Sequence, residues 1–217
     1  MRILLIDHGR CDPPHAQVHA LRHALELAGI EAAVCGPSSV PGLDQQAPGM
    51  FGMHLDDVAA ASRRLLTAVR SGDAATLLTT VATVPARLLG LVRETARQTI
   101  AEATDAVDPD VIFVLHAGIL TDLAVETGAP VVVHVSGDDL TAAEGRPSLR
   151  RLVAGAVGSC GVVVAATDET AAVLRRDWLG GDPDGRCEVW PIADVAAATA
   201  PLAAACRRAV AFRQGVL

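Results

Sequence analysis

Short apolar runs alternate along the chain with longer segments in which apolar residues recur every three or four positions. Uninterrupted apolar runs such as residues 2–6 are typical of strands buried on both faces of a sheet. The second pattern is typical of amphipathic helices. The predicted strands are 2–6, 31–35, 111–115, 130–135, 162–165 and 187–190. The predicted helices are 15–28, 55–70, 73–107, 119–126, 148–157, 169–177 and 195–212.

Strands that alternate with helices predict an α/β fold with right-handed crossovers. We expect a Rossmann-like, doubly wound and mostly parallel sheet, in a single domain that covers residues 1–217. Residues 36–53 are rich in glycine and proline and are predicted to form a long loop. Pro85 should kink or split the long helical segment 73–107.

Composition narrows the functional classes. The formal net charge of −7 argues against a general nucleic-acid binder, which would carry a basic face. The five cysteines form no CxxC pair, so neither a zinc knuckle nor a disulfide framework is indicated, and a reducing cytoplasm is the expected location. The N-terminal apolar run is too short for a signal peptide, and no stretch is long enough for a membrane span.

Polar residues follow most of the predicted strands, where ligands bind in open α/β sheets. His8 follows the first strand, His116 the third, and the segment VVVHVSGDDL, residues 131–140, carries His134 into a polar turn. Three of the seven histidines therefore gather at strand ends. These groups could form a ligand site, or the turns could simply cap the following helices. Thr167, followed by two acidic residues, is typical of such a cap.

Other motifs are weak or missing. His15, His19 and His23 are spaced four residues apart on the first helix, which suits either a polar helix face or a metal site. No metalloenzyme spacing supports the second interpretation, and no metal is predicted. The dinucleotide fingerprint GxGxxG, the phosphate-binding GxxxxGK[ST] and the nucleophile motif GxSxG are all absent.

Several segments together resemble the N-terminal, acceptor-side domain of family 4 glycosyltransferases, which have the GT-B fold. MRILLID and AQVHALRHALELAGIEAAVCGP resemble the first βαβ unit of that family. DPDVIFVLHAGILTDLAVETGAPVVVHVSGDDL resembles its central block of strand, histidine, helix, strand and histidine. VVVAATDETAAVLRRDWL and CEVWPIADV resemble the two units that follow. The resemblance covers most of residues 1–195 and implies one half of a GT-B fold.

The resemblance implies an enzyme that transfers a sugar from a nucleotide-sugar co-substrate to a small-molecule acceptor, with no metal and no tightly bound cofactor. It implies that His134 is the catalytic base or polariser beside the reacting hydroxyl, a role that suits an imidazole at neutral pH. The acceptor-lining residues would be His116, Ser136, Gly137, Asp138, Asp139 and Thr167. The residues that border the nucleotide-sugar would be His8, Gly9, Arg10 and His15.

The sequence departs from the family in three places. The donor domain of the family is missing, since the chain stops one helix after CEVWPIADV. Pro13, Pro14 and His15 stand where the family has a glycine pair, so this loop lacks the residues that let a backbone approach a phosphate closely. The end of VVVHVSGDDL can be matched in two registers, one with His134 and one with Ser136 at the position of the family histidine.

These departures leave three functional hypotheses. The first is the acceptor-side half of a glycosyltransferase, completed by a partner chain or by a second copy of this chain. The second is a non-catalytic scaffold or activator of a partner glycosyltransferase, and the third is a fragment of a longer transferase. The polar strand ends favour the first hypothesis, and the missing glycine pair favours the second. The apolar loop tip at residues 48–53 is a candidate contact in an oligomer.

Overall fold

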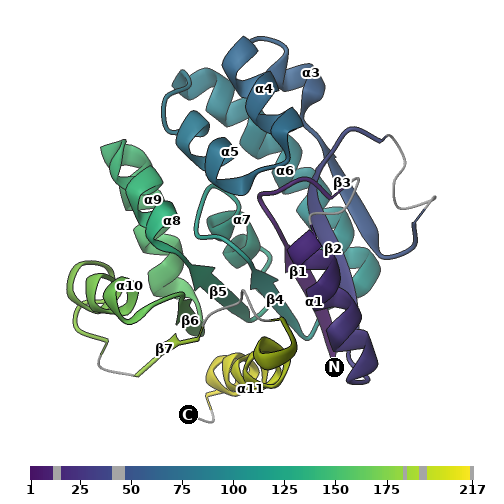
Figure 1. Ribbon diagram of the computed structural model, residues 1–217, viewed down its shortest axis with the longest axis vertical. Helices are drawn as coiled ribbons and strands as arrows, with labels where there is room; N and C mark the ends of the chain where they lie inside the picture. The colour runs from purple at the N-terminus through teal and green to yellow at the C-terminus, as the bar shows by residue number, and fades with distance from the viewer. Residues whose placement is uncertain (12–15, 41–46, 183–184, 191–194, 216–217) are drawn as a thin grey trace.

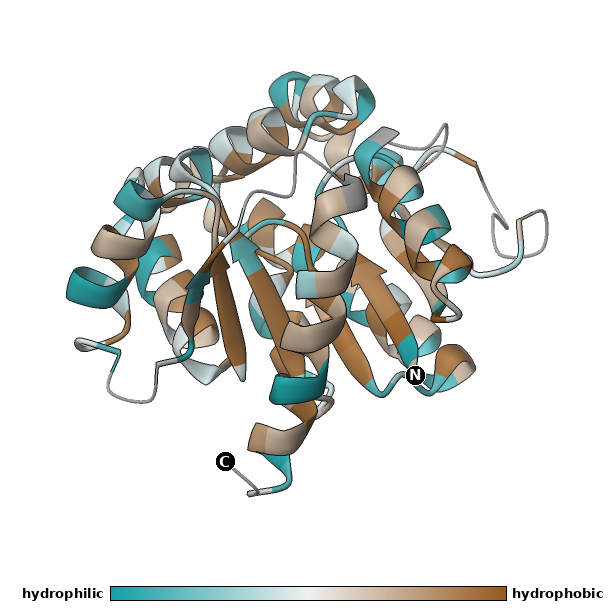
Figure 2. Ribbon diagram, turned by 60° about the horizontal axis from the view of Figure 1, so that its bottom comes forward, coloured by the Kyte–Doolittle hydropathy of each residue, from teal (hydrophilic) through white to brown (hydrophobic). Residues whose placement is uncertain are grey.

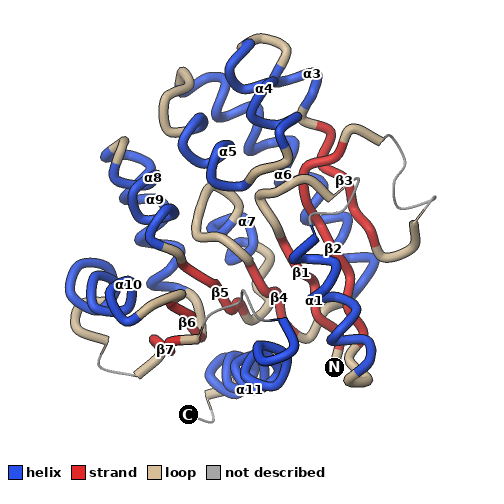
Figure 3. The backbone as a smooth tube through the Cα atoms, in the orientation of Figure 1, coloured by secondary structure: helices blue, strands red, loops and turns tan. Residues whose placement is uncertain are grey.

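One parallel sheet organises the computed structural model, which describes residues 1–11, 16–40, 47–182, 185–190 and 195–215. Within these residues seven strands pair in the order β3-β2-β1-β4-β5-β6-β7, and every pairing is parallel (Figure 3). The strands are β1 (Arg2–Ile6), β2 (Glu31–Ser38), β3 (Met50–His54), β4 (Val111–Val114), β5 (Val131–Val135), β6 (Val162–Ala165) and β7 (Cys187–Val189). This confirms the expected α/β, doubly wound architecture.

Helices cover both faces of the sheet (Figure 1). On one face lie α1 (Ala16–Leu27) and α11 (Val195–Arg213). The other face is covered by α3 (Asp56–Ala59), α4 (Arg63–Ser71), α5 (Ala74–Val81), α6 (Ala86–Val107), α7 (Thr121–Glu126), α8 (Gly137–Glu144), α9 (Pro147–Ser159), α10 (Asp168–Val173) and the π-helical turn η1 (Leu174–Trp178). The apolar strands therefore lie between two layers of helices, as Figure 2 shows by hydropathy.

The alternation of side chains along each strand builds the two cores. In β1, Leu4 and Ile6 pack into the larger core beneath α4 to α10, whereas Ile3 and Leu5 face α1 and α11. All four side chains are fully buried. Burial on both faces explains why these strands appear in the sequence as continuous apolar runs.

Two predicted boundaries were wrong. The expected loop 36–53 is partly strand, because β2 continues to Ser38 and β3 pairs with it, with Met50 opposite Val34. The expected single helix 55–70 is two helices, since Ser62 adopts an extended conformation and its hydroxyl accepts from the Leu65 amide to begin α4. Pro85 separates α5 from α6, as predicted.

The helix α8 was not predicted either. Its start is the polar turn after β5, where Ser136 and Asp139 form a capping box: each side chain accepts from the backbone amide of the other residue. The helix is short and carries few large apolar residues, so its periodic signal in the sequence is weak. The segment VVVHVSGDDL is therefore a buried strand followed directly by a helix start.

The structure also addresses the cysteines and the membrane question. All five cysteines are buried and none is in a disulfide. No helix in the described ranges combines the length and the apolar character needed to cross a bilayer.

Candidate functional site

The sheet has one point at which its strand order reverses. From β1 the chain continues outward to β2 and β3, and later returns to the other side of β1 with β4 and proceeds to β7. At such a switch point the loops after the two central strands diverge and leave a crevice at the carboxyl ends of the strands. Asp7, His8 and Gly9 follow β1, and His116, Ala117 and Gly118 follow β4.

His116 and Asp139 form the central pair of this region. The Nδ1 atom of His116 lies 3.2 Å from Oδ1 of Asp139, which as a carboxylate accepts the imidazole proton. This fixes the tautomer and leaves Nε2 facing Asp7, whose Oδ1 lies 3.9 Å away, beyond hydrogen-bond length. The His116 side chain is 20% exposed, whereas Asp7 and Asp139 are almost completely buried.

The charges around His116 outweigh its burial. Burial alone would lower the pKa of this imidazole, but the hydrogen bond to Asp139 and the negative charges of Asp139, Asp7 and Asp73 raise it above its ordinary value. The proton on His116 is therefore held more firmly than on an isolated histidine.

Asp139 joins two segments by hydrogen bonds. One carboxylate oxygen accepts from the Ser136 amide at 2.8 Å and from the Ala117 amide at 3.2 Å, while the other accepts from His116. The start of α8 is thereby joined to the turn after β4. Because these are charge-assisted hydrogen bonds to a buried group, they hold His116 in a defined orientation.

His8, in contrast, is a buried acceptor of a backbone hydrogen bond. Its Nε2 atom accepts from the Leu120 amide at 3.2 Å, so the ring proton lies on Nδ1. Burial and the nearby His116 lower the pKa of His8 to about 3, against a smaller raising effect of Asp139, so the ring is neutral. Gly118 allows this approach: a Cβ atom there would lie 2.6 Å from Nε2 of His8 and 2.2 Å from Leu78 of α5.

His134, predicted as the catalytic residue, lies within β5 and is 4% exposed. Its Nδ1 donates to the Leu115 carbonyl at 3.1 Å, which leaves Nε2 as an acceptor. Burial lowers the pKa of His134 to about 4. The charge of Asp139 raises this pKa and the charge of His116 lowers it, each by less than burial does. Its ring lies 6.4 Å from that of Trp190. His134 is thus neutral and shielded, whereas His116 is accessible.

The other predicted residues divide into caps and exposed groups. Thr167 caps α10 by accepting from the Thr170 amide, which confirms the cap interpretation. Ser136 caps α8, and Gly137 and Asp138 are exposed beside it. Arg10 points to the β2 side, where its guanidinium donates to the Ser39 hydroxyl.

Gly9 and His15 are the remaining residues that were predicted to border the nucleotide-sugar. Gly9 donates its amide to Oδ1 of Asp7. Asp7 was not among the predicted site residues, although it is the first polar residue after β1. His15 lies outside the described residues. Among the residues that the structure describes, no three His, Cys, Asp or Glu side chains lie close enough together to hold a metal ion.

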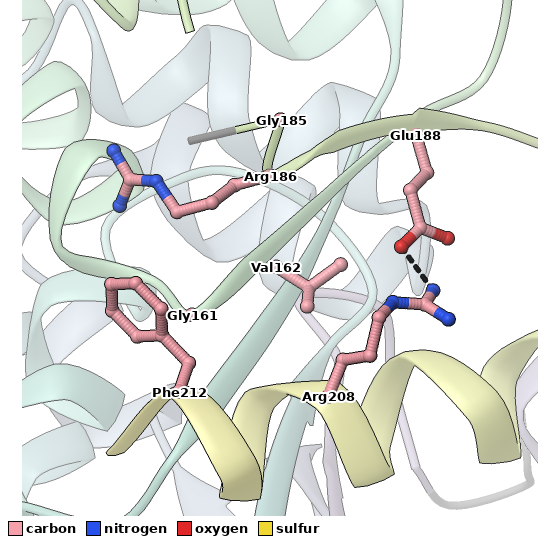
Figure 4. A pocket seen from close by; sticks show the side chains of 7 residues that line it. All are labelled: Gly161, Val162, Gly185, Arg186, Glu188, Arg208 and Phe212. Atoms are coloured by element: carbon pink, nitrogen blue, oxygen red, sulfur yellow. Dashed lines mark hydrogen bonds and ion pairs between the residues drawn. The ribbon is translucent and has the colours of Figure 1, made fainter. Parts of the chain in front are cut away.

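A cavity of about 210 Å³ lies at the opposite edge of the sheet, at the amino ends of β6 and β7 (Figure 4). Arg208 forms an ion pair with Glu188 at one end, and Arg186 lies over the Phe212 ring at the other, with 5.7 Å from Cζ to the ring centroid. Arg186 also donates to the carbonyls of Gly158 and Cys160. The charged side chains of this cavity already have partners within the protein. We therefore place the candidate site at the switch point.

Known proteins resemble this chain in structure alone. No protein-family model matches the sequence, and no characterised protein matches it by sequence. Sucrose-phosphate synthase from Thermosynechococcus elongatus matches with a TM-score of 0.59 and 13% identity, over 96% of this chain and 98% of the solved chain.

Two sugar-nucleotide epimerases match as well. The UDP-N-acetylglucosamine 2-epimerase from Rickettsia bellii has a TM-score of 0.54 at 12% identity, over 93% of this chain and 48% of its own. The UDP-GlcNAc 2-epimerase from Neisseria meningitidis, solved with UDP-GlcNAc, has a TM-score of 0.50 at 16% identity, over 87% and 46%. The chain thus spans about half the length of these epimerases. At such identities the likeness concerns the fold, and the chain has the architecture of one Rossmann-like half of the GT-B fold.

Proposed function

We propose that this chain is the acceptor-side half of a GT-B-type, sugar-nucleotide-dependent transferase. The observation that carries the proposal is the His116–Asp139 pair at the switch point of the sheet. A histidine that is oriented by a buried carboxylate and whose side chain is 20% exposed is suited to general-base catalysis. The base would take the proton of an acceptor hydroxyl as that oxygen attacks the sugar.

Within this proposal the base is His116 instead of His134, for two physical reasons. A base must reach the proton that it abstracts, and His134 is buried in β5 with one nitrogen bound to Leu115. Its pKa of about 4 also makes it a weak proton acceptor at neutral pH, whereas the pKa of His116 is raised.

The nucleotide-sugar would be bound mainly by a second half that faces the carboxyl edge of the sheet. Supporting this, the chain spans about half the length of the epimerases that share its fold. The second half would come from a partner chain, from a second copy of this chain, or from further residues of a longer protein. Positive groups there would stabilise the charge that develops on the leaving diphosphate. No metal ion or tightly bound cofactor belongs to the proposal.

The test compares His116→Gln with the control His23→Gln, which changes an exposed histidine on α1. Both variants are purified with whatever chains accompany the native protein, and release of UDP from UDP-GlcNAc is measured with and without candidate acceptors. We expect His116→Gln to lower kcat by about 10²- to 10⁴-fold without unfolding the chain, the usual contribution of a general base. An unchanged kcat would remove His116 from the mechanism.

A scaffold function is the second candidate. It is favoured by the burial of Asp7, His8 and Asp139, which are held by bonds within the protein and leave His116 as the accessible histidine among the three at the strand ends. A scaffold would stabilise a partner transferase through the same edge. In that case His116→Gln would leave the activity of the complex equal to that of the wild type, while loss of the whole chain would lower it.

A further inference from the structure

We propose that His8 is a positioning residue for His116, and that it acts through the acceptor nitrogen that it offers to the Leu120 amide. This inference rests on the proposed function, in which His116 is the base, and it names a second residue on which that base depends. Three observations carry it: the contacts of the His8 ring, the start of α7, and the anchoring of the loop after β1.

The His8 ring contacts the turn 116–120 at both of its ends. Its Nε2 atom accepts from the Leu120 amide at 3.2 Å, and the ring meets that of His116 edge-on, with centroids 6.3 Å apart. Gly118 lies between these contacts and leaves room for the ring, since a Cβ atom there would lie 2.6 Å from Nε2. The other nitrogen, Nδ1, is buried and has no partner among the described residues. The bond to Leu120 is therefore the contact that gives the ring a defined direction.

The acceptor of the Leu120 amide is distant in the sequence. Leu120 directly precedes α7, and no side chain caps the start of this helix. The first amides of a helix need partners from outside it, which a local Ser, Thr, Asp or Asn usually supplies. Here the partner is His8, 112 positions earlier in the chain. This bond therefore sets where α7 begins relative to β1, and with it the path of the turn that carries His116.

The loop after β1 is a firm base for this contact. On one side of His8, the Asp7 amide donates to the Cys35 carbonyl at 3.0 Å, and on the other the Arg10 amide donates to the Gly72 carbonyl at 3.2 Å. The His8 side chain is 1% exposed. Burial lowers its pKa to about 3, so Nε2 stays an unprotonated acceptor at neutral pH. The ring is thus fixed by its surroundings, and the turn is held against it.

What His8 positions is the bond between His116 and Asp139. This bond is 3.2 Å long, at the upper end of the normal range, so a small shift of the turn would break it. Burial lowers the pKa of His116, and the hydrogen bond to Asp139 is the largest of the contributions that raise it. Displacement of the turn should therefore lower the pKa of His116 and weaken it as a base.

The experiment uses the full chain, with its imidazoles labelled for NMR, and three variants. His8→Leu keeps a buried side chain of comparable size and removes the acceptor. His8→Gln keeps an acceptor, because its amide oxygen can take the place of Nε2. Leu202→Ala in α11 is the control: it truncates a fully buried side chain in the core on the other face of the sheet.

We expect His8→Leu to lower the pKa of His116 in an NMR titration. It should also lower kcat by about 10- to 100-fold with little change in KM, the effect of a misplaced catalytic group. His8→Gln should restore most of both quantities, which a role in packing alone would not predict. Leu202→Ala should change neither. In the wild type, the nitrogen resonances of His8 should show its proton on Nδ1.

Two results would overturn the inference. One is a wild-type His8 with its proton on Nε2, which could not then accept from Leu120. The other is a wild-type titration of His116 in His8→Leu. If His8→Leu does not fold, His8→Gln is compared with His8→Asn, whose shorter amide cannot reach Leu120, and equal titrations of His116 in these two would also overturn it.

The proposed function is judged by a different measurement. A wild-type protein that binds its partners but shows no transferase activity would contradict the function, while the tautomer of His8 and the titration of His116 would still decide the inference. Conversely, full activity in His8→Leu with loss of activity in His116→Gln would support the function and contradict the positioning role of His8.

Discussion

At the scale of single residues, three histidines of similar sequence context have three different environments. His8 and His134 are neutral because burial lowers their pKa values to about 3 and about 4. His116 has a raised pKa because Asp139 offsets the cost of its burial. The sequence shows that all three follow or end predicted strands. It cannot show which of them meets a carboxylate, because Asp139 lies 23 positions further along the chain.

The first prediction concerns Asp139→Asn. Burial of His116 would remain while the charge and the charge-assisted hydrogen bond that raise its pKa would be lost, so the pKa of His116 should fall. An NMR titration of the imidazole measures this directly. If His116 is the base, the acidic limb of the pH–rate profile should move to lower pH by the same amount. The exposed neighbour Asp138→Asn is the control and should shift the titration much less.

At the scale of secondary-structure elements, the turn between β4 and α7 organises the site. Residues 116–120 supply His116, donate the Ala117 amide to Asp139 and donate the Leu120 amide to His8. The ion pair between Arg93 of α6 and Asp122 of α7 holds the far side of this turn, with Arg93 also donating to the Ile119 carbonyl. Hydrogen bonds to side chains of α6, of α8 and of the loop after β1 therefore fix the turn.

The second prediction tests this packing with Gly118→Ala. The new methyl group would overlap Leu78 and His8, so one of them must move, and overpacking of this kind costs about 1–3 kcal/mol. Gly155→Ala in α9 is the control: nothing lies within 4 Å of its added methyl group, and alanine favours the helix by about 0.5–1 kcal/mol. Urea unfolding of both variants should show opposite signs. If Gly118→Ala is as stable as the wild type, the turn can relax to accommodate the added methyl group.

The elements themselves were predicted unevenly. Strands β1, β4, β5 and β6 are apolar on both faces and were found from the sequence. The strand β3 (MFGMH) was missed, because it is short, contains glycine and acquires strand geometry only by pairing with β2. The helix α8 was missed for the related reason that its capping box, not its periodicity, defines it.

At the scale of the whole molecule, buried histidines couple stability to pH. His8 and His134 have folded-state pKa values below the value of about 6.5 expected when unfolded, so the unfolded chain takes up their protons first as the pH falls. Their stabilising contribution is present above about pH 6.5 and is lost as the pH falls toward 4. His116 acts in the opposite sense, since its raised pKa stabilises the fold below about pH 6.5 and this contribution is lost as the pH rises through that pKa.

The third prediction follows from these signs. The free energy of unfolding should be greatest between about pH 6.5 and the raised pKa of His116. Below about pH 6.5 it should fall by about 1.4 kcal/mol per pH unit for each of the two neutral histidines. Urea unfolding between about pH 5 and pH 8 measures the profile. His134→Gln should halve the slope on the acidic side, whereas His23→Gln on the surface should not change it. If His134→Gln keeps the acidic slope of the wild type, groups other than His134 dominate the pH dependence of stability.

The alternation of apolar runs and helical periods in the sequence determined the α/β class, most of the strands and the gathering of polar residues at strand ends. Those properties are local, because burial on both faces leaves its pattern in the residues of the strand itself. Only the tertiary structure decided that β4 lies beside β1, that His116 meets Asp139, and that His8 accepts from Leu120, 112 positions away. The imidazole that can exchange a proton is set by such distant neighbours, since pKa depends on burial and nearby charge.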